Sequence, residues 1–335
     1  MPASPRDLPV WVLAAASLRA GEPAALLCVV SSAGSSPGRQ GFKMSVTATD
    51  SAGSIGGGIM EHKFIELARQ RLLTVDLSPV LRPQIHRREA PANRSGMMCS
   101  GEQEVLLWPL TTNDLPAVAA IAQALNLGTG GQLVLSLDAG LQLQNAAAAP
   151  GSPATVAGAA FYEYQPGPTW YYREQLGFRD HVTIVGGGHV SLALSKALAL
   201  LDFELTVLDD RAGLPTLAAN EAAHHRRVIN YDNVAAEIPV GPNQYVVVMT
   251  VGYRTDALVL RQLLSLPSGH GPYRYLGVMG SMAKVIALRR GLRDEGFSAE
   301  AIARLHGPIG LPINSQTPEE IAISIVAELI QVRHG

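Results

Sequence analysis

The hydrophobic pattern of residues 181–208 predicts a strand, a glycine turn, a helix and a second strand in immediate succession. Residues 181–185 form a short, β-branched apolar run that is typical of a buried strand. Three consecutive glycines follow, and apolar positions at helical spacing then predict a helix over about 190–201, before a second strand over 204–208. This order is that of a βαβ unit, and it predicts a Rossmann-like arrangement.

The rest of the second half continues this alternation. Residues 244–250 and 273–279 are largely apolar runs, as expected for parallel strands whose two faces are both covered by helices. Thr317, Pro318 and Glu320 signal a final helix, because they supply an N-cap, a first-turn proline and a capping-box acid. We therefore expect a doubly wound parallel sheet in this half of the chain.

The first half mixes helices, strands and glycine-rich turns. Its periodicity predicts helices over 8–19, 59–73 and 113–127, strands over 24–31, 43–46 and 132–137, and an exposed loop over 139–155. The second domain is expected to start near Tyr171. The predicted fold class is thus α/β, with an N-terminal α/β domain over 1–165 and a C-terminal Rossmann-like domain over 171–335.

Composition limits the kind of protein. The chain has 335 residues, enough for two domains that each bury a core, and 47% of them are apolar. A charged fraction of 16% and a formal net charge of −2 argue against binding to nucleic acid. Apolar runs stay below the roughly 18 residues of a membrane span, and two cysteines are too few for a disulfide framework. These features predict a cytoplasmic protein with no membrane span.

The glycine turn predicts a site for a phosphate-bearing ligand. Gly186 and Gly188 let the backbone approach a ligand, and the helix beginning near His189 would direct N–H groups and its positive dipole end toward an anion. Asp209 follows Gly188 by 21 residues, near the spacing at which a carboxylate meets a ribose hydroxyl. Ser191 stands where the dinucleotide fingerprint has its third glycine, so the pattern indicates the fold more strongly than bound NAD(P).

Other residues extend the candidate site. Thr250, Gly280 and Ser281 end or follow predicted parallel strands, and ligands of such sheets bind outside the carboxyl ends of strands. In the first half, a second glycine cluster opens a helix and makes another candidate anion cradle. The candidates of this half are Arg39, Lys43, Gly56, Gly57, Gly58 and Glu61. Lys43 could equally be a surface strand residue, and Glu61 part of a solvated helix face.

The two cysteines have different surroundings. Cys28 lies within an apolar strand and is expected in the core. Cys99 lies among glycine and serine residues, a setting that could expose a reactive thiolate or simply hold a partly buried small residue. No spacing of Cys, His and carboxylates resembles a zinc site, so no metal site is predicted.

Together these segments resemble the XdhC/CoxI family, accessory proteins of molybdenum hydroxylases such as xanthine dehydrogenase. The resemblance covers nearly the whole chain. It is carried in the first half by SSAGSSPGRQGFKMSV, GSIGGGIMEHKFIELAR and CSGEQEVLLWPL, and in the second by IVGGGHV, VLDDR, LGVMGSMAKV and GPIGLPINSQTPEEIAISIVAELI.

The resemblance implies a cofactor-handling chaperone more than an enzyme. It implies transient binding of molybdenum cofactor, support of its sulfuration by a sulfur donor such as a cysteine desulfurase, and insertion into a xanthine dehydrogenase-type molybdenum hydroxylase. Lys284 would meet a charge of the cofactor, and Cys99, the candidate catalytic residue, would lie near the metal. An NAD(P)-dependent oxidoreductase remains the alternative, and a homodimer is the default assembly.

Three positions depart from the pattern of the family. The stretch TVGYRTD after the strand ending in Thr250 replaces a T-H-x-H-like stretch, Met282 replaces a basic residue, and Pro312 replaces an acidic one. We therefore expect no metal or proton role for histidines at the first of these positions.

Overall fold

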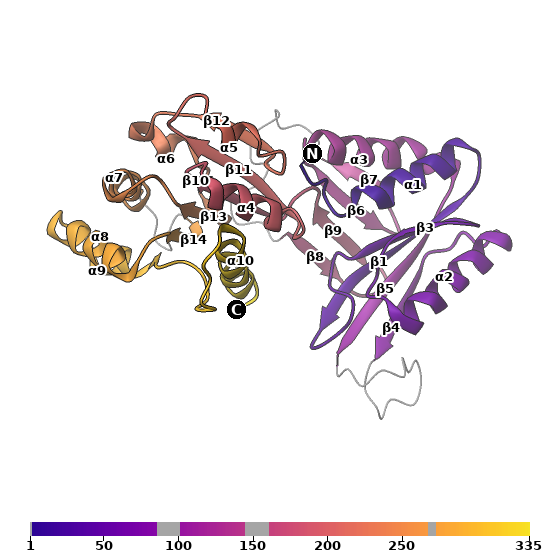
Figure 1. Cartoon of the computed structure of the whole chain (residues 1–335). Helices are drawn as coiled ribbons and strands as arrows, with labels where there is room; N and C mark the ends of the chain where they lie inside the picture. Colours follow the sequence, from indigo (N-terminus) through magenta and orange to yellow (C-terminus); the bar gives the residue numbers. More distant parts are fainter. Residues whose placement is uncertain (1, 86–100, 145–160, 267–272) are drawn as a thin grey trace. The chain divides into compact units, whose positions relative to one another are not determined.

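The computed structural model describes residues 2–85, 101–144, 161–266 and 273–335, which belong to two compact units (Figure 1). One unit spans residues 4–177, and the other comprises residues 178–335 together with the first residues of the chain. Each unit has its own hydrophobic core and is described separately. Within the described residues, no helix is long and apolar enough to cross a membrane.

The first unit combines two antiparallel sheets with helices. Its helices are α1 (Leu8–Arg19), α2 (Gly58–Leu73) and α3 (Leu115–Leu127), the last preceded by a 3₁₀ turn, Thr112–Asp114. Its strands are β1 (Ala24–Ala33), β2 (Lys43–Val46), β3 (Ser51–Gly53), β4 (Val80–Ile85), β5 (Glu102–Leu110), β6 (Gln132–Ser136), β7 (Gly140–Gln144), β8 (Tyr162–Gln165) and β9 (Tyr171–Gln175). One sheet has the order β3-β2-β1-β5-β4, and the other β7-β6-β9-β8.

Strand β1 is buried on both faces, which explains its continuous apolar sequence. Ala25, Leu27 and Val29 pack in the cluster that contains Phe64 of α2. The alternate residues of β1, including Cys28, pack in a larger cluster with α1, α3 and the second sheet. Alternation of side chains along the strand therefore assigns α2 to one face of the first sheet and α1 and α3 to the other.

The second unit is a doubly wound parallel sheet. Its strands are β10 (Asp180–Val185), β11 (Phe203–Asp209), β12 (His225–Val228), β13 (Gly241–Val248), β14 (Tyr273–Val278) and β15 (Leu305–His306). Its helices are α4 (His189–Leu198), α5 (Pro215–Ala218), α6 (Val234–Glu237), α7 (Tyr253–Leu264), α8 (Met282–Asp294), α9 (Ala299–Ala303) and α10 (Pro318–His334), with a 3₁₀ turn at Tyr231–Asn233. The order β12-β11-β10-β13-β14-β15 is that of a Rossmann fold.

Helices cover both faces of this sheet. Side chains of α4, α5 and α10 share one buried cluster with alternate residues of the strands, and α6 to α9 share the cluster on the opposite face. The two faces explain why the central strands are apolar at nearly every position. The predicted α/β class and the Rossmann-like second half are confirmed.

Most predicted elements are present, with shifts at their ends. Helix α1 and strand β2 have the predicted bounds, and α10 begins with the predicted reciprocal capping box between Thr317 and Glu320. Helix α4 ends at Leu198 instead of near residue 201. The predicted loop over 139–155 was wrong at its start, because residues 140–144 form β7, while residues 145–155 lie outside the described part.

The division between the units lies after the expected start near Tyr171. Strand β9, which begins at Tyr171, pairs with β6 and β8 of the first unit. The division therefore falls between Gly177 and Phe178.

Gly186→Ala is expected to destabilise the second unit. Gly186 has φ of +115°, and a Cβ there would lie 2.3 Å from the backbone oxygen of Met249. The conformation alone would cost about 1–3 kcal/mol, to which the backbone clash adds. Differential scanning calorimetry should show a clear fall in the melting temperature of this unit.

Gly188→Ala is the matched control. Gly188 has φ of −72°, and no heavy atom of the described residues lies within 4 Å of the position its Cβ would take. The free energy of unfolding of the Gly188→Ala variant should differ from that of wild type by no more than about 0.5 kcal/mol. Equal melting temperatures for the two variants would contradict the proposed constraint at Gly186.

Candidate functional site

The predicted site residues of the second unit gather at the carboxyl edge of the parallel sheet. Val185, Leu208, Val248 and Val278 are register partners of one another on neighbouring strands, so the loops that follow them emerge side by side. The predicted residues in or next to these loops are Gly186, Gly188, His189, Asp209, Thr250, Gly280, Ser281 and Lys284. This edge is where ligands of doubly wound sheets bind.

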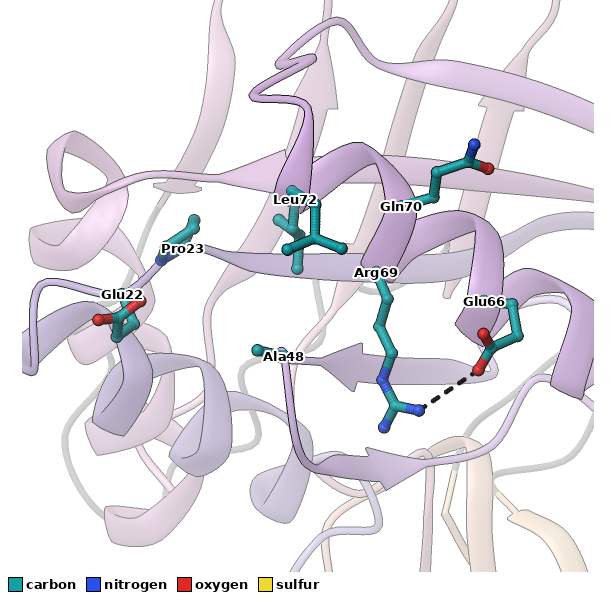
Figure 2. A pocket seen from close by; sticks show the side chains of 8 residues that line it. Glu22, Pro23, Ala48, Glu66, Arg69, Gln70 and Leu72 are labelled. Carbon is teal, nitrogen blue, oxygen red and sulfur yellow. Dashed lines mark hydrogen bonds and ion pairs between the residues drawn. The ribbon is translucent and has the colours of Figure 1, made fainter.

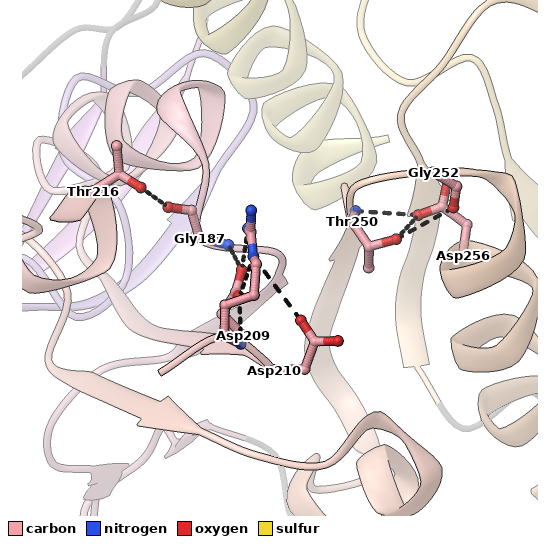
Figure 3. Close-up of polar contacts among 8 residues, drawn as sticks. Gly187, Asp209, Asp210, Thr216, Thr250, Gly252 and Asp256 are labelled. Atoms are coloured by element: carbon pink, nitrogen blue, oxygen red, sulfur yellow. Dashed lines mark hydrogen bonds and ion pairs between the residues drawn. The ribbon is translucent and has the colours of Figure 1, made fainter. Parts of the chain in front are cut away.

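The glycine turn is fixed by hydrogen bonds from its middle residue (Figure 3). The Gly187 N–H donates to Asp209 Oδ2 at 2.7 Å, and its carbonyl oxygen accepts from Thr216 Oγ1. Gly188 occupies the N-cap position of α4, and the exposed His189 is the first residue of that helix. The turn therefore presents the N-terminus of α4 at the edge of the sheet.

Asp209 is fully buried, and its carboxylate already has several donors. Besides the Gly187 N–H, it accepts the Arg211 backbone N–H at 2.9 Å and two guanidinium N–H groups of Arg211 at 2.8 Å each. Burial acts to raise the pKa of Asp209, but these hydrogen bonds outweigh burial and hold the pKa below its usual value. Asp209 thus acts on the turn and on Arg211, rather than presenting free oxygens to a ribose.

Arg211 is the charged group that Asp209 positions, and sequence reasoning missed it. The guanidinium lies with Asp210 at the exposed end of β11, and 43% of the Arg211 side chain is exposed. A guanidinium fixed on one side by a carboxylate keeps N–H donors for an anion on its other side. The available signal was the aspartate-arginine pair that follows the second strand of the βαβ unit.

A second polar group lies where β13 and β14 end. Asp256, fully buried in the first turn of α7, accepts hydrogen bonds from the Thr250 N–H at 3.1 Å and from Thr250 Oγ1 at 2.6 Å. Its other oxygen pairs with Lys284, which also donates to the Met279 carbonyl oxygen at 3.0 Å. Ser281 caps α8 through the Lys284 N–H, and Gly280 precedes it. Lys284 is therefore a partly exposed ammonium group held by a buried carboxylate.

The glycine cluster of the first unit is folded around a carboxylate of its own helix. Glu61 Oε2 accepts the backbone N–H groups of Ile55 and Gly57, both at 2.9 Å, and the Ser54 hydroxyl at 2.6 Å. Gly57 is the N-cap of α2 and Gly58 its first residue. The donors that we expected to face an external anion are thus directed to Glu61.

Gly56 and the loop containing Arg39 approach each other closely. A Cβ on Gly56 would lie 2.4 Å from the backbone nitrogen of Gly38. The buried Gln103, which sequence reasoning missed, joins these loops by accepting the Gly38 N–H at 2.8 Å and donating to the Ile55 carbonyl oxygen at 3.2 Å. Arg39 itself is exposed and donates to the Gly34 carbonyl oxygen at 2.7 Å.

Lys43 lies in the core of the first unit. Its side chain is fully buried, and its Nζ is 2.8 Å from Asp7 Oδ2, 2.5 Å from Glu174 Oε1 and 2.8 Å from the Gly41 carbonyl oxygen. Burial alone would lower the pKa of Lys43, but the two carboxylates outweigh burial and raise it. Its three N–H groups thus have acceptors within the protein, and none is directed to a surface phosphate.

Of the two cysteines, the structure describes Cys28 alone. Cys28 is buried opposite Lys43 in the β1–β2 ladder, and burial raises the pKa of its thiol to about 12. Cys99 lies outside the described residues. Within the part of the chain that the structure describes, no group of three or more His, Cys, Asp or Glu side chains could hold a metal ion.

The first unit also contains a pocket of about 380 Å³ beside α2 (Figure 2). The residues that line it are Glu22, Pro23, Ala48, Glu66, Arg69, Gln70, Leu72 and Leu73. They differ from the residues that the sequence singled out.

Lys43→Met is expected to destabilise the first unit strongly. The substitution leaves Glu174 buried without its cation, and breaking a buried ion pair in this way costs about 3–5 kcal/mol. Urea denaturation should detect this loss. The double variant Lys43→Met/Glu174→Gln should recover part of it, and Lys63→Met on the exposed face of α2 should change little. If Lys43→Met lowered the free energy of unfolding as little as Lys63→Met does, the result would contradict the buried ion pair.

A cluster at the opposite edge of the second sheet predicts a pH-dependent stability. Glu204 accepts from His181 Nδ1 at 2.6 Å and from His225 Nε2 at 3.0 Å. The hydrogen bond to Glu204 raises the pKa of His225 above its usual 6.5, although burial opposes this. Burial would raise the pKa of Glu204, but its histidine partners lower it below the usual 4.5.

The sign of the effect follows from these two directions. The contribution of His225 is complete below pH 6.5 and is lost as the pH rises through its raised pKa, whereas that of Glu204 is complete above pH 4.5 and is lost in acid. Wild type should therefore be more stable than His225→Gln at about pH 5.5 and equally stable at about pH 9, as measured by urea denaturation. His62→Gln is the control, and a pH-independent difference for His225→Gln would contradict the assignment.

Comparisons with known proteins agree with this architecture. Residues 182–329 match a model described as the XdhC Rossmann domain, and residues 17–77 match a model described as the XdhC and CoxI family. A crystal structure of a xanthine dehydrogenase from Bacillus halodurans has the same fold, with a TM-score of 0.67 at 20% sequence identity. This likeness covers 97% of the chain and 96% of the other protein.

Two curated proteins match about half of the chain. An uncharacterized protein YqeB of Escherichia coli (strain K12) is 32% identical over 162 residues, which are 48% of this chain and 28% of YqeB. A probable xanthine dehydrogenase subunit of Bacillus subtilis (strain 168) is 26% identical over 155 residues, which are 46% of this chain and 43% of the relative. The chain thus matches less than half the length of either relative. The two family models, found in the expected order in the two units, show that the chain belongs to the XdhC and CoxI family.

Proposed function

We propose that this protein is an accessory protein of a xanthine dehydrogenase-type molybdenum hydroxylase. In this role it binds molybdenum cofactor transiently, supports its sulfuration and inserts it into the hydroxylase. Membership of the family and the name of the Bacillus subtilis relative support an accessory role linked to xanthine dehydrogenase. The groups at the carboxyl edge of the second unit support binding of the cofactor itself.

The observation that carries the proposal is the pairing of the glycine turn with Arg211. A pterin phosphate needs backbone N–H donors and positive charge, which the N-terminus of α4 and the Arg211 guanidinium offer. Among the described residues, no heavy atom lies within 4 Å of a Cβ built on Gly188, so the backbone can be approached there. The donor set of this edge therefore suits the phosphate of the cofactor.

The other groups at this edge suit the polar rim of the pterin. Asp210 is exposed and can accept from pterin N–H groups, while Lys284 adds a second positive charge near the ends of β13 and β14. When bound, the cofactor would supply the molybdenum redox centre that the hydroxylase uses. The role of the chain is to bind and orient it, and Cys99 is proposed to lie near the metal.

The assembly around this role is also a proposal. A sulfur donor such as a cysteine desulfurase would provide the sulfur, and the chain would work as a homodimer. The donors and charges at the edge of the sheet all belong to one unit and depend on neither partner.

The second candidate function is an NAD(P)-dependent oxidoreductase. The Rossmann topology favours it, but the oxygens of Asp209 are engaged by Gly187 and Arg211. An exposed arginine at this position suits a ribose 2′-phosphate better than a free diol. If a nicotinamide nucleotide binds, NADP(H) should therefore bind more tightly than NAD(H).

Retention of cofactor tests the proposed function. Full-length protein mixed with molybdenum cofactor should retain it through gel filtration and restore activity to a cofactor-free hydroxylase. Arg211→Lys keeps a charge but loses the paired hydrogen bonds, so its affinity should fall roughly tenfold. Arg290→Ala, an exposed arginine of α8, is the control and should bind as wild type does.

Two results would oppose the proposal. The first is a protein that neither retains the cofactor nor restores the hydroxylase. The second is tight NADP(H) binding with turnover, measured by calorimetry and absorbance on the same purified protein, which would favour the second candidate. Arg211 also neutralises Asp209, so the substitution can act on the fold as well as on the ligand. A loss of affinity is assigned to the ligand contact when Arg211→Lys melts at the same temperature as wild type.

A further inference from the structure

The last helix, α10, carries apolar side chains on its exposed side as well as on its buried side. Those that pack in the core with the parallel sheet and α4 are Ala322, Ile325, Val326 and Leu329. On the other side, Ile323 is 55% exposed and Ile330 is 36% exposed, with the partly buried Ala327 between them. These three residues recur at helical spacing, and we call the line that they form the outer stripe of α10. A helix that is apolar on both sides is typically covered on both sides.

A carboxylate and an imidazole lie at the two ends of the outer stripe. Glu319 is four residues before the first isoleucine of the stripe and His334 is four residues after the second, so both continue the same line. Both are exposed, and within the part of the chain that the structure describes neither side chain has an ion pair or hydrogen bond. By contrast, Glu320 caps the start of α10, and Arg333 pairs with Asp180. Glu319 and His334 are therefore available to a partner.

The order of these five residues is self-complementary. When a second α10 lies antiparallel across a two-fold axis between residues 326 and 327, Glu319 faces the partner's His334, and Ile323 faces the partner's Ile330. Ala327 then lies beside the axis, where its small side chain lets the two helices approach closely. The Glu319 carboxylate can accept an imidazole N–H across the axis. A parallel pairing would instead set Glu319 against a second Glu319, so these groups select the antiparallel one.

The face around the outer stripe has the size that a stable interface needs. Helix α10 has 17 residues, and a helix of this length is about 25 Å long. It packs beside α4 on this face of the sheet (Figure 1), so the pairing of two copies brings two helices of each together. Stable interfaces bury at least about 1,200 Å² in total, which a layer two helices wide on each copy can supply.

We propose that the outer stripe of α10 is the surface through which two copies of this chain form a two-fold dimer. This inference rests on the homodimer of the proposed function and names the residues that build it. Its form follows from the apolar stripe, the small residue at the axis and the two unengaged polar ends. Gly188 and Arg211 are not part of the stripe, so binding of the cofactor does not require the dimer.

A charged substitution in the stripe tests the interface by sedimentation velocity of the full-length protein. Wild type should sediment as a dimer. Ile323→Lys sets a charge against the partner's Ile330 in both halves of the interface, so the dissociation constant of the dimer should rise at least roughly tenfold. Ile286→Lys is the matched control and should leave the dimer unchanged, because Ile286 is 59% exposed on α8, which covers the opposite face of the same sheet. The circular dichroism of both variants should match that of wild type.

Exchange of the two polar ends gives a readout that a change in folding would not produce. Glu319→Lys removes the acceptor for the partner's His334, and His334→Glu sets two carboxylates face to face. Each should raise the dissociation constant roughly threefold to tenfold. The double variant Glu319→Lys/His334→Glu restores opposite charges across the axis and should return to within about twofold of wild type. Since both substitutions oppose the dipole of α10 itself, this recovery cannot come from the helix alone.

The outcomes separate this inference from the proposed cofactor role. Wild type that sediments as a monomer overturns the interface, and so does a dimer that Ile323→Lys leaves intact or that Ile286→Lys disrupts equally. A double variant that dimerises more weakly than either single variant also overturns it. Retention of molybdenum cofactor is scored separately by gel filtration, and monomeric Ile323→Lys should retain it as wild type does. Wild type that is dimeric but retains no cofactor overturns the cofactor role and supports the interface.

Discussion

The buried carboxylate of Asp209 is the interaction on which the candidate site depends. It accepts the Gly187 N–H, so it fixes the glycine turn, and it accepts the guanidinium of Arg211, so it fixes the charge at the end of β11. A buried carboxylate without these donors would be strongly unfavourable, which couples the turn and the arginine to the stability of the sheet. The binding edge is therefore built before any ligand arrives.

The same principle recurs in the first unit with a different consequence. Glu61 accepts the N–H groups of the second glycine loop, so this loop resembles an anion cradle that contains an anion of its own chain. A phosphate there would have to displace Glu61. The edge of the second unit, where Arg211 adds positive charge, is the better place for a phosphate.

Local sequence signals predicted much of the fold. The capping box at Thr317, the bounds of α1 and the order of β10, α4 and β11 follow from patterns within a few residues. Strands β8 and β9 were missed because both consist of tyrosines with charged and amide side chains and contain no aliphatic residue. Glu174 shows why, since this polar residue faces the core of the first unit and is paired there with Lys43.

The sequence by itself determined the βαβ order, the glycine turns and the family, because periodicity, caps and glycine positions act between near neighbours in the chain. Only the tertiary structure decided which charges remain available. Lys43 is neutralised by Asp7 and Glu174, and Asp209 is occupied by Arg211, through contacts that depend on how strands and loops pair in space. Electrostatic partners that are separated along the chain leave little trace in the local sequence pattern. The sequence therefore predicted the fold, but it did not show which candidate ligand residues have partners within the protein.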